Sequence, residues 1–103
     1  MEAVRKMTYD FHPEAEKEFL SAINYYEESH VGLGHDFARE IYLAIQSIIE
    51  HPKTWPVFDM DIRRRLIGRF PYAVLYSVEG QTVYILAVMH LRRDPDYWKS
   101  RLK

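Results

Sequence analysis

The sequence predicts an α+β domain in which a helical hairpin packs on an antiparallel-rich sheet. The first half of the chain repeats its apolar residues at helical spacing, a Gly-rich break divides that stretch, and the second half alternates with the period of strands. A chain of 103 residues, 48% of them hydrophobic, suits one domain with a modest core. We therefore expect a single domain over residues 1–103, with residues 1–6 as a flexible terminus.

The first half is predicted to form a strand and two helices. Thr, Tyr and Phe favour a strand over Thr8–His12, and Pro13 ends that strand and suits the first position of a helix. A helix is predicted over Glu14–Ser29, with apolar residues three and four positions apart. The glycines of residues 30–34 break it, and a second helix is predicted over His35–His51, where a proline stops it. The two helices form an antiparallel hairpin.

The second half is predicted to form a three-stranded antiparallel meander. Its apolar residues alternate with a period of two, and Gly- or Pro-containing turns separate the runs. The predicted segments are a loop at Lys53–Asp61 and strands at Ile62–Ile67, Tyr72–Val78 and Thr82–Met89. With the N-terminal strand as a fourth member, the meander makes an antiparallel-rich sheet with the helical hairpin on one face.

The last predicted strand is apolar on both of its faces. Strict alternation separates Val83, Ile85, Ala87 and Met89 from Tyr84, Leu86 and Val88. One helical hairpin covers only one face, so the other must be closed by the chain ends, a second copy or another protein. We expect the segment Thr82–Trp98 to face a partner, with a homodimer among the options.

The composition excludes several classes of protein and site. There is no cysteine, which removes disulfides and thiolate zinc sites and fits a reducing compartment. No signal-like segment or membrane-length apolar run occurs, so a cytoplasmic protein is expected. We expect no metal and no cofactor, because His30 and His35 lack ligand spacing and no phosphate-binding Gly-rich loop is present.

Charge is divided between the two halves of the chain. Residues 1–61 hold 5 Lys/Arg against 12 Asp/Glu, a balance of −7, whereas residues 62–103 hold 9 against 3, a balance of +6. One interpretation is that the basic half meets an anionic partner. The other is that the two halves neutralise each other within the fold.

Several segments, in their order and spacing, resemble the RelE/ParE toxin superfamily and more closely its ParE-like, plasmid-stabilisation branch. They are HPEAEKEF, NYYE, GLGHDF, HPKTWP, RRRL, FPYAVLYSV and ILAVMHLRRDPDYW, which span about Met7 to Trp98. The resemblance implies a toxin of a type II toxin–antitoxin system, with the strand, helical hairpin and meander predicted above. It also implies that a cognate antitoxin holds the toxin inactive.

Two activities occur in the superfamily, and the resemblance leaves both open here. ParE-type toxins bind and block DNA gyrase, whereas RelE-type toxins cut mRNA on the ribosome. Cleavage of RNA needs cations and proton-transfer groups, and the candidates by likeness to the RelE type are Arg63, Arg65, Arg93, Tyr97 and His90. Those ribonucleases carry an arginine where this chain has Ala73, and arginine cannot act as a base at neutral pH. The binding toxin is therefore our first hypothesis and the ribonuclease the alternative. A third hypothesis is a degenerate or non-toxic member that only forms a complex.

Each catalytic candidate also has a structural interpretation. A histidine at a strand end, such as His90, commonly bonds to backbone. The cluster Arg92–Asp94 can form local ion pairs, and Arg63–Arg65 on an edge strand can discourage aggregation. Tyr97 and Trp98 are better placed to clamp the C-terminal tail than to stack on a base.

Overall fold

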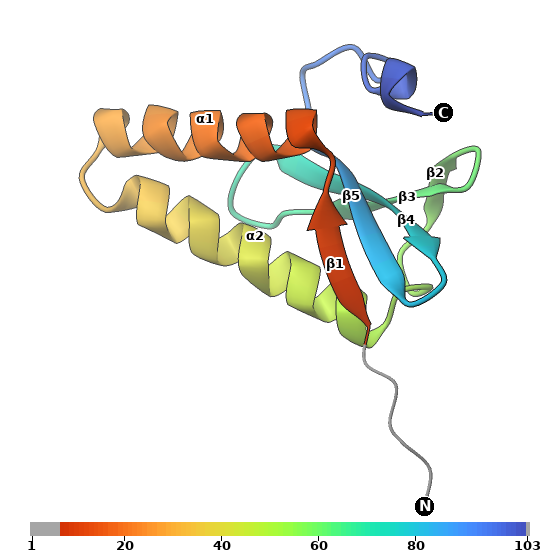
Figure 1. Ribbon diagram of the computed structural model, residues 1–103. Helices are drawn as coiled ribbons and strands as arrows, with labels where there is room; N and C mark the ends of the chain where they lie inside the picture. The colour runs from red at the N-terminus through yellow and green to blue at the C-terminus, as the bar shows by residue number, and fades with distance from the viewer. Residues whose placement is uncertain (1–6, 103) are drawn as a thin grey trace, which may run out of the picture.

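The computed structural model describes residues 7–102 and has the predicted order of strand, two helices and a strand-rich second half (Figure 1). The elements are β1 (Thr8–Phe11), α1 (Pro13–Ser29), α2 (Leu33–Glu50), β2 (Val57–Asp59), β3 (Ile62–Leu66), β4 (Tyr72–Glu79), β5 (Thr82–His90) and the 3₁₀ helix η1 (Lys99–Arg101). The predicted terminus, residues 1–6, lies outside the described residues. No helix within residues 7–102 has both the length and the apolar character needed to cross a membrane.

The sheet has five strands in the order β1-β5-β4-β3-β2. The meander β3-β4-β5 is antiparallel, as predicted, while β1 pairs in parallel with β5, so the sheet is mixed. The predicted loop Lys53–Asp61 is wrong in one respect, because it contains the short strand β2, which extends the meander by a hairpin with β3. The α+β class is confirmed, with one strand more than predicted.

Both helices begin where the local sequence satisfies their first backbone amides. Pro13 opens α1, and the Nδ1 atom of His12 accepts a hydrogen bond from the amide of Glu14 at 3.0 Å. Glu27 accepts hydrogen bonds from the amides of Gly32 at 2.9 Å and Gly34 at 3.0 Å. These bonds to backbone lower the pKa of Glu27, and they start α2 two residues earlier than predicted.

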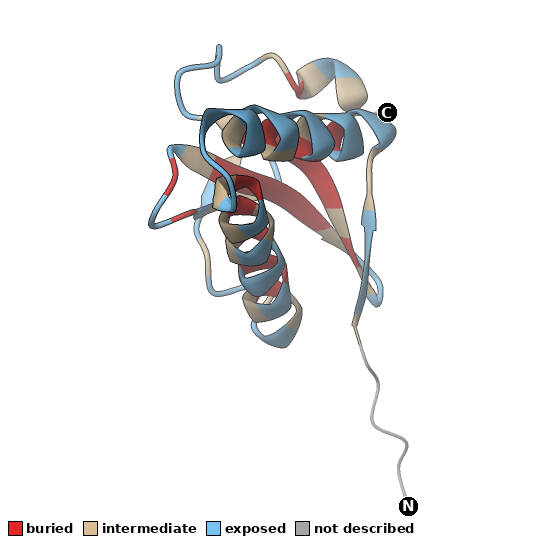
Figure 2. Cartoon of the chain, turned by 90° about the vertical axis from the view of Figure 1, so that its left-hand side faces the viewer, coloured by how far each residue is buried: buried red, intermediate tan, exposed pale blue. Residues whose placement is uncertain are grey.

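The two helices cross closely at Gly34. A Cβ atom at this position would lie 2.5 Å from the carbonyl oxygen of Ile23, so only glycine fits there. The close approach brings the apolar stripes of α1 and α2 onto one face of the sheet. Figure 2 shows that the inward sides of the helices are buried and their outward sides exposed.

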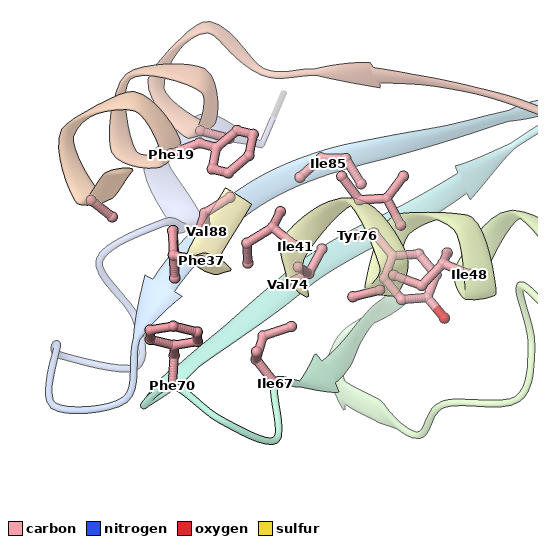
Figure 3. Packing of buried hydrophobic residues seen from close by; sticks show 14 of the residues in the cluster. Phe19, Phe37, Ile41, Ile48, Ile67, Phe70, Val74, Tyr76, Ile85 and Val88 are labelled. Atoms are coloured by element: carbon pink, nitrogen blue, oxygen red, sulfur yellow. The ribbon is translucent and has the colours of Figure 1, made fainter. Parts of the chain in front are cut away.

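A first apolar core fills the space between the helices and the sheet (Figure 3). Its central residues are fully buried and come from both helices and from β4 and β5. They include Phe37, Ile41, Ile48, Val74, Tyr76 and Ile85. Burial of such side chains contributes roughly 1.5–3 kcal/mol each, so this layer is the main source of stability.

A second apolar core lies on the opposite face of the sheet, beneath the C-terminal tail. Trp98 is fully buried there against residues of β3, β4 and β5, with Tyr97 and Leu102 packed alongside. Of the three ways to close this face, the chain end is therefore the one observed. The expectation that the face of Thr82–Trp98 calls for a partner is wrong over this central part.

A β-bulge in β5 corrects the predicted alternation of faces. Leu75 pairs with Ala87 whereas Tyr76 pairs with Ile85, so Leu86 is an extra residue on β5. Beyond Leu86, the residues of β5 face the side of the sheet opposite to the one predicted for them. Val88 packs in the first core, between the helices and the sheet (the helix-side core). Ala87 packs in the second core, beneath the C-terminal tail (the tail-side core).

Candidate functional site

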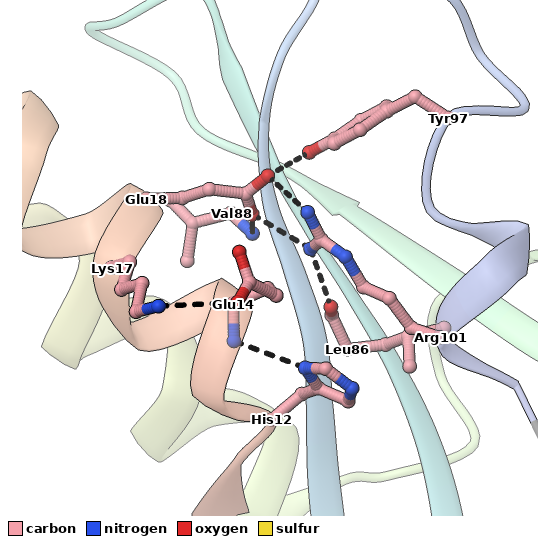
Figure 4. A network of polar contacts seen from close by, with 8 residues as sticks. All are labelled: His12, Glu14, Lys17, Glu18, Leu86, Val88, Tyr97 and Arg101. Atoms are coloured by element: carbon pink, nitrogen blue, oxygen red, sulfur yellow. Dashed lines mark hydrogen bonds and ion pairs between the residues drawn. The ribbon is translucent and has the colours of Figure 1, made fainter.

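A carboxylate from α1 joins three parts of the molecule at one point (Figure 4). Oε1 of Glu18 accepts hydrogen bonds from the amide of Val88 and from Nη1 of Arg101, both at 3.0 Å. Its Oε2 accepts from the Tyr97 hydroxyl at 2.6 Å and from Nη2 of Arg101 at 2.7 Å. The Glu18 and Arg101 side chains are only 16% and 11% exposed, so the pair is largely withdrawn from water.

This network lies beside the part of β5 that no longer pairs with β1. The β1–β5 ladder ends at the pair Phe11 and Ile85, because the chain turns into α1 at Pro13. The amide of Val88 is then satisfied by Glu18, and the carbonyl of Leu86 accepts from Nη1 of Arg101 at 3.0 Å. Side chains thus replace a strand along this part of β5.

The electrostatics of the network keep Tyr97 protonated and Arg101 charged. Burial and the hydrogen bond to Glu18 raise the pKa of the Tyr97 hydroxyl well above its ordinary range. Burial alone would lower the pKa of the Arg101 guanidinium, but the hydrogen bonds and charge of Glu18 raise it overall. Tyr97 therefore donates its hydroxyl proton in a hydrogen bond to Glu18 at neutral pH.

An open pocket of about 460 Å³ lies beside this network, between α1 and the end of β5. Tyr72, His90 and Arg93 line it, together with Arg101 and the side of α1 that carries Glu18 and Ala22. The His90 ring packs edge-on against Tyr72, with 5.0 Å between the ring centroids. The guanidinium carbon of Arg93 lies 3.8 Å from the centre of the Tyr97 ring.

The structure places Arg63 and Arg65 away from this pocket, near the C-terminal end of α2. Nη1 of Arg63 donates to the carbonyls of Lys53 at 3.2 Å and Trp55 at 2.7 Å. Arg65 donates through Nε to the Ser47 hydroxyl at 3.1 Å, and its guanidinium lies 5.0 Å from the Trp55 ring centre. Both guanidinium groups thus hold the loop before β2.

Comparison with known proteins identifies the family. The model of the family described as ParE toxin of the type II toxin–antitoxin system, parDE, matches residues 9–95. The chain belongs to the ParE toxin family. A solved structure described as the chromosomal ParDE TA system from P. aeruginosa is similar in fold, with a TM-score of 0.74 and 12% identity over 86% of this chain and 100% of that chain. No curated protein matches the sequence.

The catalytic candidates of this ParE-family chain are thus only partly brought together. His90 and Arg93 line one pocket, and Tyr97 contacts that pocket's Arg93 through its ring. Arg63 and Arg65 lie near the C-terminal end of α2 instead. Within residues 7–102, no group of three or more His, Cys, Asp and Glu side chains is arranged to hold a metal ion.

Two of the structural interpretations are also resolved. Nδ1 of His90 accepts a hydrogen bond from the amide of Arg92 at 3.0 Å, which is a backbone role. Tyr97 and Trp98 clamp the tail, one through Glu18 and the other by burial.

Sequence reasoning missed Glu18 and Arg101, the two residues that organise the site. Glu18 lies outside the apolar positions that predict its helix, and Arg101 lies beyond the segment on which the resemblance depends. One signal was available. Glu18 adjoins the apolar stripe of α1 at Phe19 and Ala22, a position from which a carboxylate reaches the edge of the sheet.

Proposed function

We propose that this ParE-family chain is the toxin of a type II toxin–antitoxin system that stops growth by binding a cellular target such as DNA gyrase. A cognate antitoxin neutralises it in the cytoplasm. Membership of the family supports the toxin class, and the fold agrees with that of the ParDE structure. The proposal covers the chain as a single domain that acts without a cofactor.

The choice of target binding over RNA cleavage rests on the hydrogen bonds that three candidate catalytic side chains already make within the chain. Arg63 and Arg65 bond to carbonyls and a hydroxyl of their own chain, and Tyr97 bonds to Glu18. Catalysis would need these groups to be directed at a scissile phosphate. Ala73 agrees with this choice, because it is fully buried in the tail-side core, where an arginine would have to bury its charge.

One observation supports the ribonuclease alternative. His90 and Arg93 line the same pocket as Tyr72, so an imidazole, a guanidinium and a phenol occur together. Such a set could act on a phosphodiester if RNA entered the pocket. The alternative thus depends on His90 and Arg93 alone, without the arginines of β3.

The experiment is controlled induction of the chain in growing cells, with a stop-codon version as the control. Plasmid supercoiling, the DNA-damage response and mRNA 5′ ends are followed over the same period. We expect growth arrest with altered supercoiling or double-strand breaks and intact mRNA. Codon-linked mRNA cleavage would instead establish the ribonuclease, and normal growth would contradict toxin activity altogether.

The antitoxin is tested through the neighbouring gene. We expect a small reading frame beside this one, and its product should restore growth when it is co-expressed. It should also co-purify with the chain in a defined ratio. A neighbour that neither binds nor protects would count against the antitoxin part of the proposal.

A further inference from the structure

The C-terminal tail covers only part of the sheet face on which Trp98 is buried. Next to the covered part lies a groove of about 870 Å³, lined on one side by Arg101 and Leu102 of the tail. The start of α1 and the turn between β2 and β3 also line it, and β4 and β5 supply the residues beneath it. The groove therefore begins where the tail stops and extends toward the turn that joins β4 and β5.

The centre of this groove is aromatic and apolar. Tyr84 of β5 lies in register with Asp10 of β1 and with Ser77 of β4, each one strand spacing of about 4.8 Å away. The His12 ring packs edge-on against Tyr84, with 6.1 Å between the ring centroids. Met60, which is 67% exposed, also lines the groove. Such a surface suits the aliphatic stem and the cationic end of a Lys or Arg side chain.

The carboxylates around this centre have no cationic partner among the described residues. Asp61 and Glu79 line the groove, and the register places Asp10 on the same face of the sheet as Tyr84. Within residues 7–102 no ion pair involves any of these three carboxylates. Glu79 accepts a hydrogen bond from the Ser77 hydroxyl at 3.2 Å, and a carboxylate has room for further donors.

The positive charge at the groove is already engaged elsewhere. Arg101 is the only Lys or Arg among the described residues that line it, and both of its Nη atoms donate to Glu18. Nη1 of Arg101 also donates to the carbonyl of Leu86. The groove therefore attracts cationic side chains and repels anionic ligands such as nucleic acids.

We propose that a basic, partly apolar segment of the toxin's protein target docks in this groove. Basic side chains of that segment pair with Asp61 and Glu79 and pack on Tyr84, while its apolar side chains pack on Met60. The inference rests on the proposed function, since the target is the protein that the toxin binds to stop growth. The opposite charges steer the target to this face, and the contacts at the centre of the groove hold it there.

The first test compares growth arrest by the wild-type chain and by two double variants. Asp61→Lys with Glu79→Lys reverses the charge of the groove. The control, Glu28→Lys with Glu50→Lys, makes the same charge change at exposed residues that do not line it. We expect the groove variant to lose growth arrest and the control to retain it. If DNA gyrase is the target, inhibition of supercoiling by the purified groove variant should need at least about a tenfold higher concentration.

Two measurements separate loss of docking from loss of the fold. The urea midpoint of the groove variant should stay near that of the wild type, and the variant should still bind the product of the neighbouring small reading frame. The milder pair Asp61→Asn with Glu79→Gln should weaken growth arrest in the same direction. Full growth arrest by the folded groove variant would overturn the inference and leave the proposed function intact. Absence of growth arrest by the wild-type chain would overturn both.

A peptide probe tests the chemistry of the occupant directly. We expect a short capped peptide of alternating Leu and Arg to shift the amide resonances of Ser77 and Tyr84, and the same peptide with Glu in place of Arg to leave them unchanged. Equal shifts with both peptides would contradict a charge-selective groove. The chain that starts at Met7 is measured as well, because it lacks Arg5 and Lys6. If the peptide shifts these amides only after residues 1–6 are removed, the chain's own segment is the occupant and the inference is wrong.

Discussion

Removal of the Glu18 carboxylate should destabilise the fold far more than loss of an ordinary surface ion pair. Glu18→Ala removes the partner of Arg101 and the acceptor of the Tyr97 hydroxyl and the Val88 amide. Removing one member of a buried charge pair costs about 3–5 kcal/mol, because the remaining charge stays withdrawn from water. The Arg101 side chain is 11% exposed, and some solvent can reach it, so we expect the lower end, about 3 kcal/mol.

The measurement is urea unfolding of Glu18→Ala beside Glu14→Ala. Glu14 lies one turn earlier on α1, and its pair with Lys17 is exposed, so its removal should cost under about 1 kcal/mol. For a chain of this size a loss of 3 kcal/mol corresponds to a fall in Tm of roughly 15 °C. Equal and small losses for the two variants would refute the reasoning that burial gives the Glu18 network its strength.

The double variant of Glu18 and Arg101 separates the network from the single residues. If the cost of Glu18→Ala arises from a stranded guanidinium, adding Arg101→Met should recover part of the lost stability. Strictly additive losses would mean that the two side chains act independently. Urea midpoints at constant m-value give this comparison directly.

Three further outcomes are expected. Burial and Glu18 raise the pKa of Tyr97 above its ordinary value of 10.0, so its hydroxyl ionises at lower pH in the unfolded chain than in the folded one. Above pH 10 the wild type should therefore lose stability more steeply than Tyr97→Phe. Parallel profiles of unfolding free energy against pH would contradict this. Gly34→Ala should cost about 1–3 kcal/mol in urea unfolding, because its Cβ meets the backbone of α1, whereas Gly68→Ala, with open space around it, should be nearly neutral. Trp98→Ala should cost about 3–5 kcal/mol and increase binding of a hydrophobic dye, and a change below about 1 kcal/mol would mean that the tail does not close the second face.

The helices were predictable because local signals agree with the packing. The apolar stripes, Pro13 and the Gly-rich break fix both helices to within two residues of their observed ends. β2 was not predictable from its own residues. It exists through pairing with β3, across a turn in which Met60 adopts a φ of 53°, a conformation usually signalled by glycine or asparagine.

The faces of β5 could not be predicted because the strand is apolar throughout. Alternation identifies a face only when polar residues mark the other one, and between Val83 and Met89 nothing polar marks the bulge at Leu86. The bulge is decided by distant contacts. It turns the amide of Val88 toward Glu18, which lies 70 residues away in the sequence.

The charge division between the halves of the chain now has a structural explanation. Four of the six ion pairs formed by residues 7–102 join the acidic half to the basic half, including Glu18 with Arg101 and Asp59 with Lys99. Much of the opposite charge is therefore neutralised inside the fold, so net charge alone says little about partners. Arg93 differs from these paired residues, because its guanidinium lies over the Tyr97 ring and lines the pocket beside α1.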